Sequence, residues 1–328
     1  MRTLDSTVPG SDEAARDVAP LVSVVVLTYN RRPLLERCLR QLALQTHPAI
    51  ETIVVDNASS DGTADLVATC FPAVTLIRNT ENLYFTGGMN KGILAAHGEY
   101  VLLLTDDVLL EPEYIAKLLP AVTADDAVGL VAGVVYDEST RTVICAGGDI
   151  RFGLDLVHII VNRVAGPDAH GRPLQVVGYV PPTMALARRA VLHAVGLFDD
   201  EFKFTSEDVD LVLQMKRQRY AIVVNHAASG YYMKPLSTAD RETPTIDFHM
   251  QKNLFLLYFK HASLRMLLGF LLYRGAWFTK VWLLSKIDGR QPLRQSTLRA
   301  HLWCLTKAPW LIQKRIRLQA LSGTREGA

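Results

Sequence analysis

Two adjacent carboxylates follow a strongly apolar run near the first third of the chain. Asp106 and Asp107 come just after residues 100–104, which are apolar without alternation. Such a run is typical of a strand covered on both faces of a parallel sheet. Ligands of open α/β sheets bind beyond the carboxyl ends of the strands, where two acids could hold a divalent metal and, through it, a diphosphate. An acidic turn is the alternative interpretation.

Polar side chains also end two other apolar runs. Thr28, Tyr29 and Asn30 follow residues 22–27, and Asp56 follows residues 52–55. No Gly-x-Gly-x-x-Gly loop or P-loop follows the first run, which argues against a dinucleotide-binding dehydrogenase. Asp and Asn side chains at these positions could read the edge of a pyrimidine or hold a ribose. Asp56 could equally cap a turn.

The elements that must position these residues alternate between strand and helix. Strands are expected at residues 22–27, 52–55, 74–77 and 100–104, with helices between them, and residues 87–88 are expected to open a loop before a helix at 89–97. Further helices are expected at residues 186–195 and 208–217. This alternation predicts βαβ units and an α/β fold with a mostly parallel sheet. Residues 128–178 give no clear pattern.

Four motifs carry a resemblance to a known family. They are VVVLTYN at residues 24–30, VVDNASSDGT at 54–63, NLYFTGGMNKG at 82–92, and GLFDDEF at 196–202 with SEDVDL at 206–211. In this order, with Asp106 and Asp107 between the third and the fourth, they resemble family 2 glycosyltransferases over residues 22–236. The subgroup that the chain is most similar to includes rhamnosyltransferases of bacterial surface polysaccharide synthesis.

The resemblance implies a GT-A fold and assigns roles to individual residues. The implied donor nucleotide site consists of Thr28, Tyr29, Asn30, Asp56, Arg78, Asn82, Gly87, Gly88 and Asp106. Asp106 and Asp107 would ligate Mg²⁺ or Mn²⁺, because carboxylates suit hard cations. His226 is a further candidate ligand, although counting from the preceding helix puts Tyr232 near the position where relatives have a metal-binding histidine.

The resemblance also implies that Asp208, with Glu207 beside it, is the catalytic base. A single base opposite the leaving group implies displacement with inversion at the anomeric carbon. The two acids could instead simply begin the helix at 208–217, where the helix dipole favours negative charge. Because that dipole lowers the pKa of a carboxylate, burial or acceptor binding would have to restore basicity.

Charge divides the chain unevenly. Residues 251–328 carry 14 Lys and Arg against two acids, whereas residues 1–250 carry 21 against 31. We expect a disordered tail at residues 1–20, the catalytic domain at 21–240, and a basic, apolar helical extension at 241–328. No window of about 18 residues in the extension lacks charge, so a spanning helix is not expected. The extension is predicted to lie on an anionic membrane; packing on the catalytic domain or another subunit is the alternative.

These observations predict an inverting, metal-dependent glycosyltransferase. The expected donor is a dTDP- or UDP-sugar, with dTDP-rhamnose as one candidate, and the expected acceptor is a polyprenyl-linked glycan. The four dispersed cysteines indicate a reducing cytoplasm, so the enzyme is expected at the inner face of the cytoplasmic membrane. No nucleic-acid partner is expected, and a homo-oligomer is left open. The alternatives are a catalytically silent nucleotide-sugar-binding scaffold and a nucleotidyltransferase.

Overall fold

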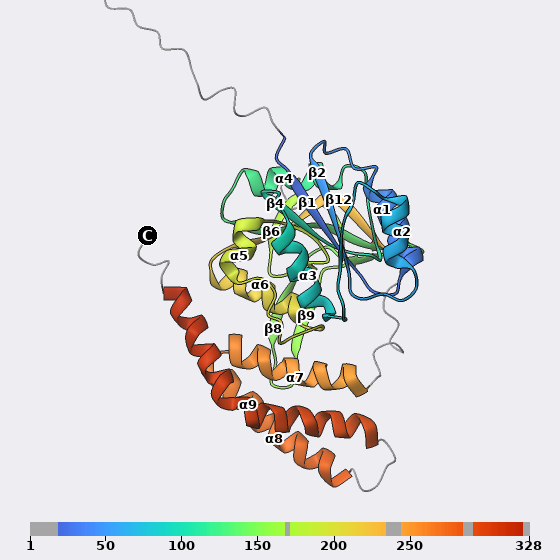
Figure 1. Cartoon of the computed structure of the whole chain (residues 1–328). Helices are drawn as coiled ribbons and strands as arrows, with labels where there is room; N and C mark the ends of the chain where they lie inside the picture. Colours follow the sequence, from blue (N-terminus) through green and yellow to red (C-terminus); the bar gives the residue numbers. More distant parts are fainter. Residues whose placement is uncertain (1–18, 168–170, 234–243, 285–290, 324–328) are drawn as a thin grey trace, which may run out of the picture.

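The computed structural model describes residues 19–167, 171–233, 244–284 and 291–323. The α/β body is a central sheet flanked by helices, and three C-terminal helices lie along one side of it (Figure 1). The predicted disorder of residues 1–20 concerns a segment of which residues 1–18 lie outside the described part.

One half of the sheet consists of parallel strands in the order β4-β1-β2-β3. These strands are β1 (Val22–Thr28), β2 (Ile50–Asp56), β3 (Thr75–Arg78) and β4 (Tyr100–Thr105). The connecting helices are α1 (Arg32–Leu42), α2 (Thr63–Cys70) and α3 (Tyr84–Ala95). All seven residues of β1 are buried, as expected for a strand covered on both faces.

The register of these strands brings their polar ends together. Thr28 lies opposite Asp56, and Asp56 lies opposite Arg78 on the next strand. On the other side of β1, Leu27 lies opposite Thr105, so Asp106 follows at the same edge. The predicted convergence of the strand ends is therefore present in the fold.

The other half of the sheet is mixed. β11 (Met184–Arg188) runs antiparallel between β4 and β6 (Val128–Asp137), and β6 is parallel to β12 (Ala221–Tyr232). Shorter strands complete this half: β5 (Val108–Leu110), β7 (Val143–Cys145) and β10 (Leu174–Val177). Its helices are α4 (Tyr114–Thr123), α5 (Arg189–Val195) and α6 (Glu207–Arg217). Residues 128–178, where the sequence showed no pattern, thus supply much of this half.

Two of the expected elements were wrong in their bounds. Residues 186–188 belong to strand β11 and not to a helix, because they form a short buried run between β4 and β6. Gly87 and Gly88 lie inside helix α3 and do not open a loop. A Cβ on Gly88 would lie 2.5 Å from Leu27 Cδ1, so this glycine lets the helix pack directly on β1.

The C-terminal extension is helical, as predicted, but many of its apolar side chains are buried in a hydrophobic core. Its helices are α7 (Pro244–His261), α8 (Leu264–Leu284) and α9 (Gln291–Gly323). Residues 254–259 of α7 are all buried, packed with Phe202 and Val209 of the α/β body. A hairpin of β8 (Gly148–Phe152) and β9 (Val157–Val161) also contacts α7, since the Tyr258 hydroxyl donates to the Gly153 carbonyl at 2.6 Å.

Three basic residues of the extension do not face solvent. Lys252, Lys260 and Arg274 are each less than 5% exposed, and Arg274 lies 4.9 Å from the centre of the Trp277 ring. These three residues are therefore unavailable to lipid phosphates, although the extension as a whole was predicted to lie on an anionic membrane. Among the described residues, no helix has both the length and the apolarity required to cross a membrane.

Candidate functional site

The carboxylate pair lies in the turn between β4 and β5. Asp106 Oδ2 accepts a hydrogen bond from the Thr28 hydroxyl at 2.7 Å, which ties β4 to β1. The Arg31 guanidinium lies 2.9 Å from Asp107 Oδ2 and 3.4 Å from Asp106 Oδ1. Burial, with the adjacent Asp107 charge, raises the pKa of Asp106 to about 6 despite the Thr28 and Arg31 contacts. Sequence reasoning missed Arg31, although it stands directly after the Thr28-Tyr29-Asn30 motif.

The pair has the properties of a partial cation site. Asp107 Oδ1 is buried and makes no hydrogen bond within the described part of the chain, so one oxygen atom is left for a ligand. The same ranges hold no group of three or more His, Cys, Asp or Glu side chains arranged for a metal. Two carboxylates without a protein cage suit Mg²⁺ or Mn²⁺ bound together with substrate phosphates and water. The residues present therefore fit such an ion.

His226 does not belong to this pair, contrary to the sequence prediction. Its Nδ1 accepts from the Gly166 backbone at 3.1 Å, beside the pairing of Asn225 with Gly133. Strand β12 reaches the turn that holds Asp107 only at Tyr232. Tyr232 pairs with Val108, the residue after Asp107, and on its other side with Asp137 of β6. Four residues of strand separate Gly133 from Asp137, or roughly 13 Å, which is too far for one metal.

The predicted nucleoside side is formed by the loops after β1 and β2. Asn30 Oδ1 accepts from the Ser60 amide at 2.8 Å, and Asp56 Oδ1 accepts from the Ser59 amide at 3.0 Å. Asn30 and Asp56 thus hold the loop that joins β2 to α2, while Tyr29 is 45% exposed. The exposed Tyr29 ring is available for stacking, whereas the Asn30 side chain already has a structural contact.

A chain of polar contacts that sequence reasoning missed runs from exposed Lys91 on α3 to the buried side chains of Asn79 and Asn57. Lys91 Nζ donates to Asn79 Oδ1, and Asn79 Nδ2 donates to Asn57 Oδ1, each at 2.8 Å. Asn57 Nδ2 in turn donates to the Tyr84 carbonyl at 2.8 Å. Each of these residues lies within a quoted sequence motif or beside one, but nothing in their spacing reveals that they touch.

The remaining predicted donor residues have distinct positions. Arg78 is exposed at the end of β3, opposite Asp56. Asn82 Oδ1 accepts from the Tyr84 amide at 2.8 Å and so caps the turn before α3. The space that a Cβ on Gly88 would need is filled by Leu27 and Asn57, and Gly87 faces Leu83. Both glycines therefore have packing roles within this structure.

Asp208 and Glu207 begin helix α6, as the sequence predicted. The Tyr179 hydroxyl donates to Asp208 Oδ2 at 2.6 Å. Burial raises the pKa of Asp208 above its ordinary value, although the Tyr179 bond opposes the shift. The helix N-terminus favours the ionised form of Asp208 and so lowers its pKa, whereas burial raises that pKa and thereby restores the basicity of the carboxylate. Sequence reasoning gave no signal for Tyr179.

Glu207 differs from Asp208 in its contacts. Its Oε2 is buried without a hydrogen-bond partner among the described residues. Burial, followed by the neighbouring Asp208 charge, raises the pKa of Glu207 well above its ordinary value. The pair therefore favours one ionised carboxylate, Asp208, beside a protonated Glu207.

Tyr232 is influenced by the charge of one carboxylate from each of the two sets. Its hydroxyl is hydrogen-bonded to the Thr183 hydroxyl. Burial raises the pKa of Tyr232, and the charges of Asp107 and Asp208 both raise it further. Both carboxylates thus act on the same phenol. The arrangement combines a partial cation site, a loop rich in polar groups and a basic carboxylate around one edge of the sheet.

Comparisons with known proteins show which family the chain is similar to. Residues 23–196, just over half of the chain, match the model of Glycosyl transferase family 2. The chain is 26% identical over 272 residues to an N-acetylglucosaminyl-diphospho-decaprenol L-rhamnosyltransferase of Mycobacterium tuberculosis, covering 75% of this chain and 86% of the relative. It is 28% identical over 198 residues to glycosyltransferase GlyG of Streptococcus pneumoniae, covering 56% of this chain and 64% of GlyG.

Two solved structures share the fold at low sequence identity. GalNAc-T7 with UDP, GalNAc and Mn²⁺ is 13% identical with a TM-score of 0.60, over 74% of this chain and 48% of that one. Mannosyltransferase PcManGT of Pyrobaculum calidifontis, with GDP-Man and Mn²⁺, is 20% identical with a TM-score of 0.51, over 94% of this chain and 78% of that one.

Proposed function

Because the chain belongs to glycosyl transferase family 2, we propose that it transfers a sugar from a nucleoside-diphosphate donor to a hydroxyl group of a lipid-linked glycan, with inversion. One observation carries the proposal. The charges of Asp107, a candidate cation ligand, and of Asp208, the candidate base, both raise the pKa of Tyr232, so a donor diphosphate and an acceptor hydroxyl could meet beside this side chain.

The donor would lie across the ends of β1, β2 and β4. We propose that Tyr29 stacks on the base, and that Thr28, Asn30 and Asp56 form the floor of the nucleoside site. Arg78 would face the nucleotide from β3, with Asn82 holding the turn beside it. Asp106 and Asp107 would hold Mg²⁺ or Mn²⁺, which when bound offsets negative charge on the departing diphosphate.

Asp208 would remove the proton from the acceptor hydroxyl. A general base works best when its pKa lies near the working pH, and burial moves the pKa of Asp208 in that direction. A protonated Glu207 next to it adds no second negative charge to the site. A single base on the acceptor side corresponds to direct displacement and an inverted product.

The names of relatives support a particular donor and acceptor class. The mycobacterial relative is named for transfer of L-rhamnose to N-acetylglucosaminyl-diphospho-decaprenol. We propose a dTDP- or UDP-sugar donor, with dTDP-rhamnose as the first candidate, and a polyprenyl-diphosphate-linked glycan as acceptor.

Such an acceptor implies work at the cytoplasmic face of a membrane, and α8 and α9 offer a surface for it. Leu264, Leu268 and Leu272 recur every four residues on α8 and are each more than half exposed. Arg265 and Lys280 are exposed on the same helix. Apolar side chains beside cations suit an anionic lipid surface.

Vesicle co-sedimentation tests the membrane proposal. We expect the protein to bind phosphatidylglycerol vesicles more than phosphatidylcholine vesicles at low salt. The double variant Leu268→Gln/Leu272→Gln should bind less, whereas Leu174→Gln, an exposed leucine on β10, should bind as the wild type does. Absence of wild-type binding to anionic vesicles would end this part of the proposal.

A thermal-shift screen tests the donor assignment. Nucleoside diphosphates of uridine, thymidine and guanosine are compared with and without Mn²⁺. A ligand of the folded state raises the melting temperature by linkage. We expect a shift with the uridine or thymidine compound that requires Mn²⁺. A shift of equal size without the metal, or none with any nucleotide, would contradict the proposed donor site.

A further inference from the structure

The loop that leads into Asp208 has an unfavourable backbone conformation. Lys203, Thr205 and Ser206 all have positive φ, between 61° and 65°, although none of them is glycine. Left-handed conformations cost energy for residues with a Cβ and persist only where surrounding contacts impose them. Because the loop ends one residue before Glu207, whatever holds it also sets the start of helix α6.

Asn253 of helix α7 makes those contacts. Its side chain is fully buried, and its Nδ2 lies 2.8 to 2.9 Å from the carbonyl oxygens of Phe202, Phe204 and Thr205, which share its two N–H groups. The adjacent Lys252 donates to the Glu201 carbonyl. Two neighbouring side chains of α7 thus place donors on four carbonyls of one loop, and the Phe202 carbonyl also accepts from the Phe204 amide at 2.7 Å.

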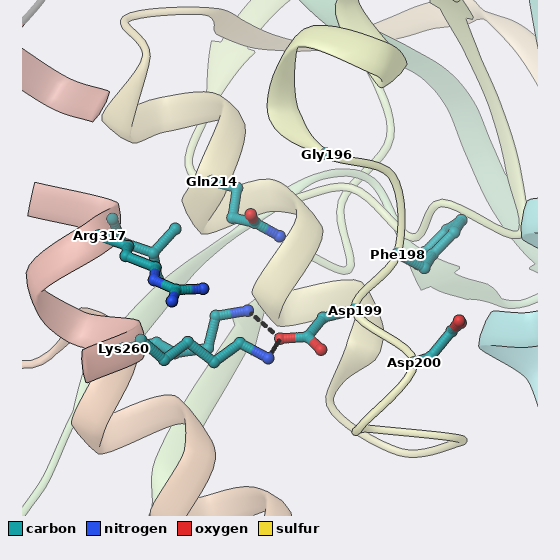
Figure 2. Close-up of a pocket in the computed structure, with 9 residues that line it drawn as sticks. Gly196, Phe198, Asp199, Asp200, Gln214, Lys260 and Arg317 are labelled. Carbon is teal, nitrogen blue, oxygen red and sulfur yellow. Dashed lines mark hydrogen bonds and ion pairs between the residues drawn. The ribbon is translucent and has the colours of Figure 1, made fainter. Parts of the chain in front are cut away.

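Helix α7 also holds α6 at its first turn. Asp210 accepts hydrogen bonds from Lys260 Nζ and from His261 Nε2, each at 2.7 Å. Lys260 also pairs with Asp199 at 2.7 Å, and Figure 2 shows it extending from its helix toward that carboxylate. Burial alone would raise the pKa of Asp210, but Lys260 and His261 lower it to about 2, so this carboxylate stays charged.

The same loop contacts the donor side of the site. The Thr86 amide of α3 donates to the Lys203 carbonyl at 3.0 Å. The Phe204 and Tyr84 rings stack with centroids 5.6 Å apart, and His249 of α7 lies 4.9 Å from Phe204. The loop therefore lies between the start of α3, the start of α6 and helix α7.

We propose that Asn253 is a positioning residue for the transfer reaction, acting through the loop at residues 201–206 to fix Asp208 relative to the donor. This inference rests on the proposed role of Asp208 as base. It makes the C-terminal extension part of the working site as well as a candidate membrane contact. Neither Asn253 nor Lys252 lies in a motif that the sequence singled out.

Steady-state kinetics on folded full-length variants test the proposal. Asn253→Ala should lower kcat at least tenfold, while the Kd for the donor and the KM for the acceptor stay within about twofold of wild type. Asn253→Ser, whose hydroxyl can still donate one hydrogen bond, should recover part of the loss. Gln251→Ala is the matched control, because this carboxamide on the same helix contacts Arg274 and Asp247 and does not contact the loop.

A further variant keeps the test decisive if Asn253→Ala does not fold. Lys252→Met removes the donor to the Glu201 carbonyl and should lower kcat in the same way but less. Wild-type kcat in either folded variant, or an equal loss in Gln251→Ala, would overturn the inference. Asp208→Asn is measured alongside: if it keeps wild-type turnover, the base assignment fails, whereas its loss combined with unchanged Asn253→Ala kinetics contradicts only the role of Asn253.

Discussion

The donor half of the site and the half that carries Asp208 are held by different means. In the donor half, regular strand register brings Thr28, Asp56 and Asp106 to one edge. In the other half, Asp208 begins a helix whose approach loop has three left-handed residues and whose supports come from α7. The comparison indicates that a repeated βα pattern is enough to assemble the proposed donor site, whereas the position of the proposed base depends on individual side chains.

The largest effect on stability is expected from removing Lys260, the buried cation that pairs with Asp199 and Asp210. Lys260→Met leaves Asp210 and Asp199 with one fewer buried cation and should lower the free energy of unfolding by about 3–5 kcal/mol. Urea denaturation at pH 7 measures this. Lys216→Met is the control, since that lysine is 40% exposed and 3.9 Å from Asp149, and should change stability by less than about 1 kcal/mol.

The contribution of the Asp210–Lys260 ion pair to stability should depend on pH. The pKa of Asp210 is lowered to about 2 in the folded protein, below the value near 3.9 of an unfolded aspartate. Its contribution is therefore full above about pH 4 and is lost as the pH falls through 2. The stability difference between wild type and Lys260→Met should shrink over that window; a constant difference would contradict the charge assignment.

A smaller loss of stability is expected in the donor half. Gly88→Ala places a Cβ 2.5 Å from Leu27 Cδ1 and 2.9 Å from Asn57 Nδ2, so α3 must move away from β1. Overpacking of this kind costs about 1–3 kcal/mol. Gly275→Ala on α8, with no atom within 4 Å of the new Cβ, is the control and should be neutral or stabilising. Unfolding by heat compares the two, and a neutral Gly88→Ala would show that close helix packing is not needed there.

A modest effect on metal binding is expected from Arg31. Its guanidinium lies against both Asp106 and Asp107, so a cation must displace it. Because the side chain is 41% exposed, the competition is screened and worth at most about 1 kcal/mol, or roughly fivefold in affinity. Arg31→Gln should therefore bind Mn²⁺ more tightly in calorimetry without nucleotide, and Arg37→Gln, whose partner is Glu138, should not. Weaker binding by Arg31→Gln would mean that the arginine assists the cation.

The smallest expected effect is a shift in the pKa of Asp208. The Tyr179 hydroxyl donates to Asp208 and so favours its ionised form. Tyr179→Phe should raise the pKa of Asp208 further and move the acid limb of the kcat/KM profile to higher pH, because the free enzyme needs the ionised base. Tyr231→Phe, which removes a contact to Glu111, should leave the limb in place. A limb that moves to lower pH would contradict the assignment.

The contrast between the two halves also explains what the sequence could reveal. The apolar runs of β1 and β4 are buried on both faces, and β2 is buried over residues 53–56, so these strands and the acids after them were predictable from period and composition. The prediction for Gly88 was wrong because the sequence alone does not distinguish a glycine that permits close helix packing from one that opens a loop. Residues 186–188 were wrongly predicted to be helical because a short apolar run fits either a helix or a strand.

The supports of the base had no signal in the sequence. Asn253 and Lys252 lie in a segment whose composition indicates an amphipathic or membrane helix, and their partners are backbone carbonyls that any residue carries. Tyr179 follows a stretch without clear periodicity. Arg31 could have been found, since a cation directly after a polar strand end must lie near the acids of the neighbouring strand.

One set of carboxylates is proposed to serve the donor, and another to serve the acceptor. Asp208→Asn keeps the size and polarity of the side chain while removing its basicity, and it is compared with Asp107→Asn for Mn²⁺-dependent donor binding and for turnover. We predict that Asp208→Asn binds donor as the wild type does and turns over about 10²–10⁴ times more slowly, whereas Asp107→Asn loses Mn²⁺-dependent donor binding as well. Full turnover by Asp208→Asn, or loss of donor binding in that variant, would contradict the account.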